Sequence, residues 1–440
     1  RVGGTALAGN LSLIGLPDVP STNIDAQIKY LRTSAQEIRA ILPPQQNLPT
    51  FVPKLGQISF KGDFTGFPKN FVVKGQLASA IGTVVSDIQM NMMGKIPHYS
   101  GDIKVNNLQL GTLTQQADLG TATFSAIVKG EGFKIDQLHT SIDAQVQQIV
   151  YKNYAYSNIT IDGEINRKLF SGRYAINDPN VQLAFSGDLN LNDSTLPKYD
   201  FTADVIRLDI DKLGLLPAGK IPKALVIAGK TDLKLTGSNI DNLQGTAKLK
   251  DVRVVQQNRT FTMQSLQLES RITPEKHILN LESDIADANF EGDFKFRQLP
   301  NAFQNYLNTY FPYHISPKPA TEAQRVNFDI KIKNAEPITS LFVQDLQKLE
   351  KGTVKGFFNT YTKEAKLDVD LPSVVYKGNE IRNLVIDAQS NANQILFKTN
   401  VSDVLLAAKG NGKPTPLPQI QLLGNVANDS LRFDLYYAAD

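Results

Sequence analysis

The sequence contains no cysteine and no tryptophan, and only four histidines among its 440 residues. The lack of cysteine excludes disulfide bonds, thiolate metal ligands and a thiol nucleophile. Lys and Arg number 46 against 43 Asp and Glu, which is too small a bias to argue for nucleic-acid binding. No run of about 18 consecutive apolar residues occurs, so the sequence contains no candidate transmembrane helix. These absences direct attention to how the apolar residues are arranged.

Motifs typical of catalysis or metal binding are also lacking. The four histidines, at positions 98, 139, 277 and 314, have neither the H-x-H nor the H-E-x-x-H spacing of zinc sites. The segment "GLLPAGKI" (214–221) approaches a phosphate-binding loop, but Ile221 stands where Ser or Thr should bind magnesium. We therefore expect no enzyme activity, no cofactor and no metal.

Apolar and polar residues alternate along most of the chain. Examples are "VQLAFSGDLNL" (181–191), "RVNFDIKIKN" (325–334) and "KLDVDL" (366–371). A period of two gives a strand one apolar and one polar face, and continuous apolar runs of the parallel-sheet type are rare. Turn signals such as "NDPN" (177–180) separate the segments. The pattern predicts an all-β dominated fold, a long antiparallel meander with a few short helices.

Four short helices are expected between the strands. Ser34 and Glu37 have the spacing of a capping box, at the start of a helix that ends before Pro43. The other three helices are expected at residues 299–312, 337–352 and 208–216, each from apolar residues at helical spacing.

One phrase occurs twice. "IVYKNYAYSNITIDG" (149–163) and "VVYKGNEIRNLVIDA" (374–388) share Val-Tyr-Lys and, later, Asn and Ile-Asp at the same spacing. A third, weaker copy is "VVQQNRTFTMQSLQLES" (254–270). Each copy is expected to form strand, tight turn and strand, in a modular array whose units contact their neighbours. In the first copy the apolar phase slips near Ser157 and Asn158, which predicts a bulge or the turn itself.

Four segments are expected. Residues 1–50 form N-terminal strands and a short helix, and 51–220 form the first sheet segment. Residues 221–320 form the second, with a terminal helix, and 321–440 form the third, with a short helix. We expect one continuous groove rather than independent domains. Because the chain begins with Arg1 rather than Met, we also expect it to be a segment of a longer protein.

Several stretches resemble a known family. "FTGFPKNFVVKGQLASAIGTVVSDIQMN" (64–91), "YKNYAYSNITIDGEI" (151–165) and "GRYAINDPNVQLAFSGDLNL" (172–191) resemble segments of bacterial TamB proteins. These are the translocation and assembly module members of the AsmA-like group. The resemblance covers residues 64–216 and is diffuse over the remainder.

The resemblance implies a long, curled, apolar-lined β-groove, taco-like in section, that crosses the bacterial periplasm between the inner and outer membranes. It implies that the groove conducts phospholipids by contact with their acyl chains. It further implies an inner-membrane anchor outside this segment and a BamA-like outer-membrane barrel as partner.

An apolar sheet face can be hidden in a sandwich, in a closed barrel or by a guest in an open trough, and alternation alone does not select among these. If a lipid is the guest, no single residue is catalytic and the lining acts collectively. The expected lining residues are Ile103, Val105, Ile159, Ile161, Leu183, Phe185, Leu189, Leu233, Leu235, Leu266, Leu268, Phe294, Phe296, Phe328, Ile330, Leu367, Val369, Leu384 and Ile386. One alternative is a scaffold or chaperone for outer-membrane protein insertion, which would add a client strand to a sheet edge. Another is a passive fibrous or adhesive β-protein.

Overall fold

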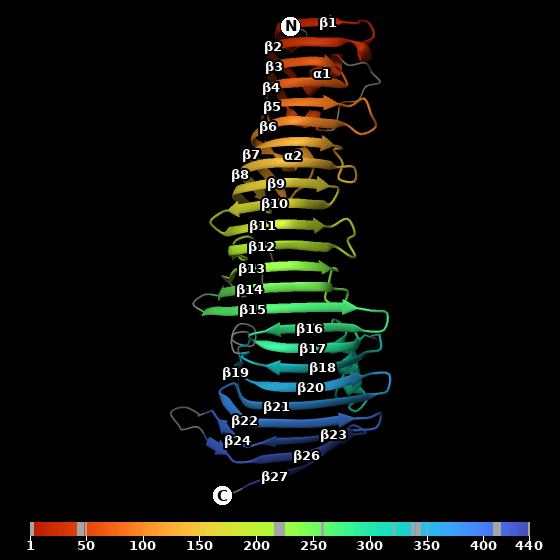
Figure 1. Ribbon diagram of the computed structural model, residues 1–440, viewed down its shortest axis with the longest axis vertical. Helices are drawn as coiled ribbons and strands as arrows, with labels where there is room; N and C mark the ends of the chain where they lie inside the picture. The colour runs from red at the N-terminus through yellow and green to blue at the C-terminus, as the bar shows by residue number, and fades with distance from the viewer. Residues whose placement is uncertain are drawn as a thin grey trace. The chain divides into compact units, whose positions relative to one another are not determined.

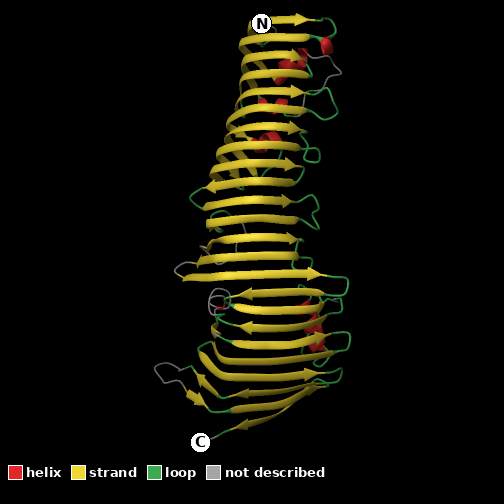
Figure 2. Cartoon of the chain, viewed as in Figure 1, coloured by secondary structure: helices red, strands yellow, loops and turns green. Residues whose placement is uncertain are grey.

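The computed structural model describes residues 4–41, 48, 51–214, 225–256, 259–319, 322–335, 339, 345–349, 351–407 and 415–438. Its strands belong to one antiparallel sheet of 27 strands, which is not closed (Figure 1). Helices are few and short (Figure 2). The predicted all-β antiparallel fold is therefore confirmed.

The chain divides into two compact units, which are treated separately below. The first comprises Arg1–Asp193 and Phe201–Ile227, and the second comprises Ser194–Asp200 and Ala228–Asp440. The expected boundary at residue 220 lies outside the described residues.

In the first unit, strands β1 to β11 pair with their neighbours in chain order. The strands are β1 (Ala6–Ile14), β2 (Asn23–Ser34), β3 (Gln57–Phe67), β4 (Asn70–Ser79), β5 (Gly82–Asn91), β6 (His98–Gln109), β7 (Leu119–Glu131), β8 (His139–Tyr151), β9 (Tyr154–Asn166), β10 (Leu169–Asn177) and β11 (Val181–Asn190). The helices are η1 (Val19–Ser21), α1 (Ala35–Ile41), η2 (Val52–Leu55) and α2 (Leu110–Thr114). Strands β12 (Lys198–Asp209) and β13 (Leu225–Thr236) each have residues in both units.

The second unit continues with β14 (Gln244–Gln256), β15 (Arg259–Ile272), β16 (His277–Ser283), β17 (Ala286–Asp293), α3 (Leu299–Asn308), β18 (Arg325–Ile332), β19 (Leu346–Leu349), β20 (Gly352–Asn359), β21 (Glu364–Tyr376), β22 (Asn379–Ser390), β23 (Ile395–Val401), β24 (Asp403–Leu406), β25 (Thr415–Leu417), β26 (Ile420–Ala427) and β27 (Ser430–Tyr437). The simple order is interrupted twice. Strand β18 pairs with β20, while the short β19 pairs with β21. Likewise β23 pairs with β26, while β24 pairs with β22 and β25.

The repeated phrase forms the same hairpin in both units. The turn between β8 and β9 consists of Lys152 and Asn153, with φ of 48° and 65°. The turn between β21 and β22 consists of Lys377 and Gly378, with φ of 50° and 79°. Two successive positive φ values match the type I′ turn, whose twist suits antiparallel strands. The predicted strand, turn and strand are therefore confirmed for these two copies.

A second shared feature is a left-handed asparagine within each hairpin. Asn158 has φ of 53° and Asn383 has φ of 49°. Neither residue has a partner in its hairpin ladder. Instead, the Asn158 amide donates to the carbonyl of Asn177 at 3.2 Å, and the Asn383 amide donates to Ser402 Oγ at 3.1 Å. The expected phase slip at Ser157–Asn158 is this left-handed residue, and the turn lies earlier in the chain.

Replacing Asn158 by Val is expected to destabilise the first unit by about 1–2 kcal/mol, because a β-branched residue is strained in the left-handed region. Asn158→Gly keeps the backbone conformation accessible and serves as the control. Urea unfolding of the two variants checks this. Equal urea midpoints for the Val and Gly variants would contradict the importance of the left-handed backbone conformation at position 158.

Two of the four expected helices are confirmed, the one expected at 208–216 is not found in its described part, and the one expected at 337–352 lies largely outside the described residues. Helix α1 follows Ser34, whose Oγ accepts the Glu37 N–H at 3.4 Å, and α3 lies within residues 299–312. Of the range 337–352, Thr339 is helical, and the expected helix is wrong at its C-terminal part, where Leu346–Leu349 form strand β19 because pairing with β21 overrides a weak helical preference; residues 337–338 and 340–344 lie outside the described part. At 208–216, β12 runs to Asp209 and the described residues that follow, up to Gly214 with φ of 59°, form a turn; residues 215 and 216 lie outside the described part. Residues 215–221, which contain most of the phosphate-loop-like segment, lie outside the described part.

Candidate functional site

The apolar side chains of β3–β11 line up in four rows on one face of the sheet, which we name the inner face of the first unit. Each row joins residues that are directly opposite on neighbouring strands. The first row is Phe60, Leu77, Val84, Val105, Phe124, Val146, Ile159, Ile176 and Leu183. The second row is Gly62, Gly75, Ser86, Ile103, Ala126, Ala144, Ile161, Tyr174 and Phe185. The third row is Phe64, Val73, Ile88, Gly101, Val128, Ile142, Gly163, Gly172 and Gly187, and the fourth row is Gly66, Phe71, Met90, Tyr99, Gly130, Thr140, Ile165, Phe170 and Leu189. The alternation seen in the sequence thus becomes apolar lanes across nine strands.

Most inner-face side chains of the first unit are only partly buried. Ile103, Ile161 and Leu183 keep part of their surface exposed, whereas Phe185 is buried with 6% exposure. In a β-sandwich, residues facing inward would be covered by a second sheet. Among the described residues of this unit, only short helices pack on the inner face. The face is therefore an open apolar surface rather than half of a closed core.

The short helices cover only the first-row side of this face. Helices α1, η2 and α2 contribute Ile38, Leu55 and Leu110 to a cluster with the buried Val105 and Leu108. This cluster seals the inner face where β3, β5 and β7 begin. Along the fourth row, at the other ends of these strands, no described helix packs.

Aromatic rings and glycines alternate on the inner face. The Phe170, Tyr174, Phe185 and Phe201 rings form a continuous group, with centroids 4.7 Å apart between Tyr174 and Phe185 and between Phe185 and Phe201. The Phe60 ring lies over Gly75, where an added Cβ would stand 2.8 Å from the ring. A ring lying flat over a cross-strand glycine fills the gap and keeps the surface smooth.

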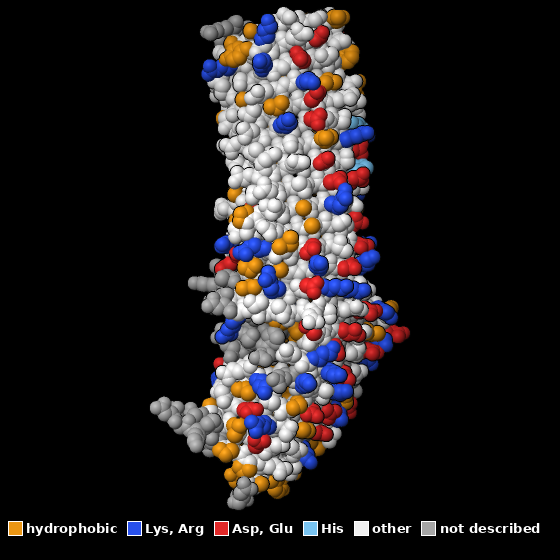
Figure 3. All heavy atoms as spheres, turned by 60° about the vertical axis from the view of Figure 1, so that its left-hand side comes forward, with side chains coloured by type: hydrophobic (Ala, Val, Ile, Leu, Met, Phe, Trp, Pro, Cys, Tyr) orange, Lys and Arg blue, Asp and Glu red, His pale blue; other side chains and the backbone are white. Residues whose placement is uncertain are grey.

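The opposite, outer face of the first unit is polar. Lys74 pairs with Asp87 at 2.9 Å, and Arg173 pairs with Asp162 at 2.7 Å. Figure 3 shows positive and negative side chains interspersed on the surface that it draws. Within the described part of the chain, no three His, Asp or Glu side chains gather where they could hold a metal ion. The outer face therefore has the character of a solvated surface.

The second unit has an inner face built in the same way. Its first row is Leu268, Leu281, Ala288, Ile330, Val354, Val369, Ile386, Thr399, Leu422 and Leu435; its second is Ser270, Leu279, Phe290, Phe328, Gly356, Leu367, Ala388, Phe397, Gly424 and Phe433; and its third is His277, Gly292, Val326, Phe358, Ala365, Ser390, Ile395, Val426 and Leu431. As in the first unit, rings lie over glycines: an added Cβ at Gly356 would stand 2.9 Å from the Phe328 ring.

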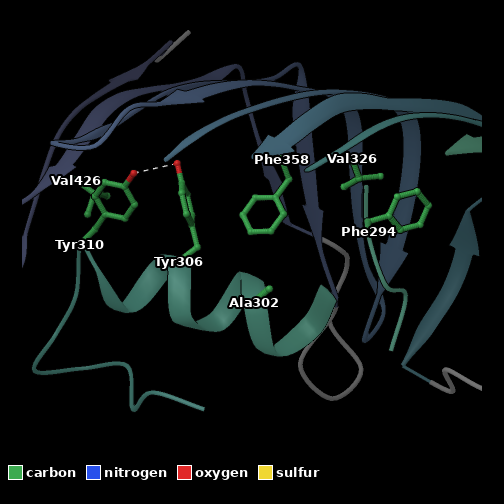
Figure 4. Packing of buried hydrophobic residues seen from close by; sticks show 7 residues of the cluster. All are labelled: Phe294, Ala302, Tyr306, Tyr310, Val326, Phe358 and Val426. Atoms are coloured by element: carbon green, nitrogen blue, oxygen red, sulfur yellow. Dashed lines mark hydrogen bonds between the residues drawn. The ribbon is translucent and has the colours of Figure 1, made fainter. Parts of the chain in front are cut away.

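Helix α3 covers the third row of the second unit. Tyr306 projects from the helix, and Tyr310 from the turn that follows it, toward the strands that arch over them, beside Phe358 (Figure 4). The Tyr310 hydroxyl donates to the carbonyl of Asn391 at 2.5 Å, and its oxygen lies 3.0 Å from the Tyr306 hydroxyl oxygen. Tyr306 is also hydrogen-bonded to Ser390 Oγ at 2.7 Å. The first two rows of this face remain mostly part-exposed beside the helix.

Most of the predicted lining residues lie on these inner faces. The first unit places Ile103, Val105, Ile159, Ile161, Leu183, Phe185 and Leu189 on its first, second and fourth rows. The second unit places Leu268, Phe328, Ile330, Leu367, Val369 and Ile386 on its first two rows, and Leu266 and Leu384 on the same face of β15 and β22. Leu233 and Leu235 are part-buried on β13, on either side of the exposed Lys234.

Two predicted lining residues lie outside the strands. Phe294 and Phe296 follow the end of β17, and Phe294 is only 4% exposed in the cluster with α3. The alternation of apolar and polar residues therefore continues past Asp293, where β17 ends, and does not mark the end of the strand. Tyr306 and Tyr310, which cover this row, were expected on a helix stripe but not as a cover of the lining; their spacing of four residues was the available signal.

A buried histidine lies at the end of the third row. His277 stacks on Phe294 with ring centroids 5.2 Å apart, and its Nε2 lies 2.9 Å from Ser270 Oγ. The Ser270 hydroxyl donates to the carbonyl of Leu243 at 2.5 Å, so Nε2 of His277 carries the proton of the shared bond. The imidazole therefore cannot act as a base toward Ser270. This pair is structural and does not form a nucleophile.

Stability of the second unit is expected to fall with acidification because of His277. Burial lowers the pKa of its imidazole; Asp241 acts against this shift and Lys295 adds to it. A lowered folded-state pKa means that the folded protein favours the neutral imidazole. The stability that His277 contributes to the second unit is therefore fully present above the unfolded-state pKa of about 6.5, and it is lost as the pH falls from there through the folded-state pKa. Urea midpoints at pH 8 and pH 5 should differ more in the wild type than in His277→Asn. An equal difference in both would contradict this assignment.

Comparison with protein-family models, with curated proteins and with solved structures finds no match for the chain. Among the described residues, no helix has the length and apolar character needed to cross a bilayer. What the protein does must therefore be argued from its inner faces.

Proposed function

We propose that the chain is a segment of a bridge that conducts phospholipids along its apolar inner faces between two membranes. The observation that carries the proposal is that the rows of the first unit, and the first two rows of the second, are mostly apolar and yet mostly only partly buried. Exposing one methylene group to water costs about 0.8 kcal/mol, so an acyl chain of about 15 carbons faces roughly 12 kcal/mol. An open apolar lane lowers that cost at every position along the sheet.

The rows are long enough for an acyl chain, and few side chains project across them. At a strand spacing of about 4.8 Å, the nine strands of the first unit give a lane of about 40 Å. Rings lying over glycines, as Phe60 does over Gly75, leave few side chains that would obstruct sliding. The lane works collectively, and no catalytic step is proposed.

The resemblance of residues 64–216 to TamB proteins supports the same proposal. Under it, the protein acts in the bacterial periplasm, is anchored to the inner membrane by a part outside this segment, and meets a BamA-like barrel at the outer membrane. No cofactor is proposed.

Protein isolated by gentle detergent extraction is expected to carry phospholipid, because an unoccupied lane would expose its apolar rows to water. Extraction of the purified protein and mass spectrometry of the lipid measure this directly. Material denatured in urea before the same purification is the control, and it should carry little lipid. Repeatedly lipid-free native preparations would count decisively against conduction.

A further inference from the structure

Four successive turns of the first unit place unpaired cations at one edge of the sheet. The turns join β3 to β4, β5 to β6, β7 to β8, and β9 to β10, and they share an edge because alternate strands of an antiparallel sheet run in the same direction. They carry Lys69, Lys95, Lys134, Arg167 and Lys168, which we name the cationic rim. All five are exposed, and within the described part of the chain none forms an ion pair.

The rim is strongly biased in charge. Its four turns contain five cations and one carboxylate, that of the exposed Asp136. At the opposite edge, cations have partners: Lys54 Nζ donates to the carbonyl of Thr112 at 2.8 Å, and Lys152 lies 5.5 Å from the Tyr151 ring centroid. Of the two edges, the rim is therefore the one whose cations lack partners.

That edge is also where the inner face opens. Helices α1 and α2 seal the first-row side, whereas the fourth row, which includes Phe71 and Tyr99, borders the rim turns. A lipid whose tails lie on the rows would meet water on the rim side. Its head group would therefore lie beside the rim.

Apolar side chains accompany the rim cations. Met93 is 71% exposed, Phe133 is 64% exposed and Ile135 is 52% exposed, in the same turns as Lys95 and Lys134. Exposed apolar groups beside cations suit the boundary between acyl chains and an anionic head group. A turn recurs every two strands, or about 10 Å, so each hairpin offers at least one cation.

We propose that the cationic rim holds the phosphate groups of phospholipids whose acyl chains lie on the inner face of the first unit. The inference rests on the proposed function, and it adds a head-group preference: lipids with an anionic phosphodiester are retained over uncharged lipids with the same tails.

The test compares retention of fluorescent phosphatidylglycerol and of diacylglycerol with identical acyl chains by the full 440-residue chain at low ionic strength. The wild type is expected to retain phosphatidylglycerol about fivefold more strongly, the factor that one cation near an anionic lipid supplies. The rim variant replaces all five rim cations, Lys69, Lys95, Lys134, Arg167 and Lys168, by Gln. The matched control replaces five exposed strand lysines by Gln: Lys29, Lys61, Lys104, Lys129 and Lys248.

The rim variant should retain the two lipids equally, with its diacylglycerol retention unchanged, while the control variant should behave as the wild type. Raising the salt should remove the wild-type preference. An unchanged preference in the rim variant, or an equal loss in the control, overturns the rim. So does displacement of phosphatidylglycerol by millimolar inorganic phosphate, which would indicate a site for the free anion. Equal retention by the wild type overturns the rim but leaves conduction standing, whereas retention of neither lipid overturns both.

Discussion

Replacing Ile159 and Ile161 by Asp is expected to reduce the phospholipid that copurifies with the protein at least tenfold. The two residues lie on the first and second rows of the inner face, opposite Ile176 and Tyr174 on β10. Two carboxylates there would interrupt adjacent lanes, because a charged group is costly to bring against an acyl chain. If an acyl chain must leave the face over the width of one strand, about 4.8 Å, about four of its methylene groups become exposed to water, which costs about 3 kcal/mol.

The matched control lies on the same strand and carries the same charges. Thr160 and Asn166 are exposed on the outer face of β9, so Thr160→Asp with Asn166→Asp adds two carboxylates where water already solvates the strand. The control should retain wild-type lipid content. Phe185 is less suitable for such a test, because it is only 6% exposed and packs in the ring group with Tyr174.

Folding and lipid content must be measured separately in this experiment. Circular dichroism and urea unfolding report whether the variant keeps its sheet, and mass spectrometry reports lipid per chain. Lipid loss with a cooperative unfolding transition supports conduction. A well-folded inner-face variant that carries as much lipid as the control would rule out a role for these rows.

The sequence predicted the sheet and most of the side chains that share an inner face, because both depend on alternation. A period of two determines which side chains share a face, so Ile103, Leu183 and Ile330 could be assigned without knowledge of their neighbours. The same local reasoning failed where pairing decides the outcome. Leu346–Leu349 form strand β19 through pairing with β21, whose partner residues Val374–Tyr376 lie 25 to 30 positions away in the chain.

The cover of the inner faces was beyond local patterns for a similar reason. The spacing of Tyr306 and Tyr310 shows that they share one side of the helical segment. It does not show that Tyr310 will bond to the carbonyl of Asn391, which is 81 residues away in the chain. The cationic rim could not be predicted from local patterns either. Its cations are separated in the chain by two complete strands and come together only because alternate turns share an edge.

Replacing Tyr310 by Ala is expected to destabilise the second unit by about 3–5 kcal/mol, the largest stability effect anticipated for a single side chain in this protein. Tyr310 is 2% exposed, and burial raises the pKa of its hydroxyl, which bonds to the carbonyl of Asn391 and to Tyr306. The substitution removes a ring from the α3 cluster and leaves those groups without their partner. Urea unfolding of the full chain measures the loss.

Phe303, on α3 itself, provides the control. It is 52% exposed and its ring centroid lies 5.9 Å from that of Phe358, so Phe303→Ala removes an aromatic ring of similar size with an expected cost of about 1–2 kcal/mol. Tyr310→Phe separates the hydroxyl from the ring, and should cost about 1–2 kcal/mol. If Tyr310→Ala and Phe303→Ala unfold at the same urea concentration, α3 does not hold the third row closed. The cluster with Phe358 would then be a weak contact, and the apolar lane of the second unit would extend across all three of its rows.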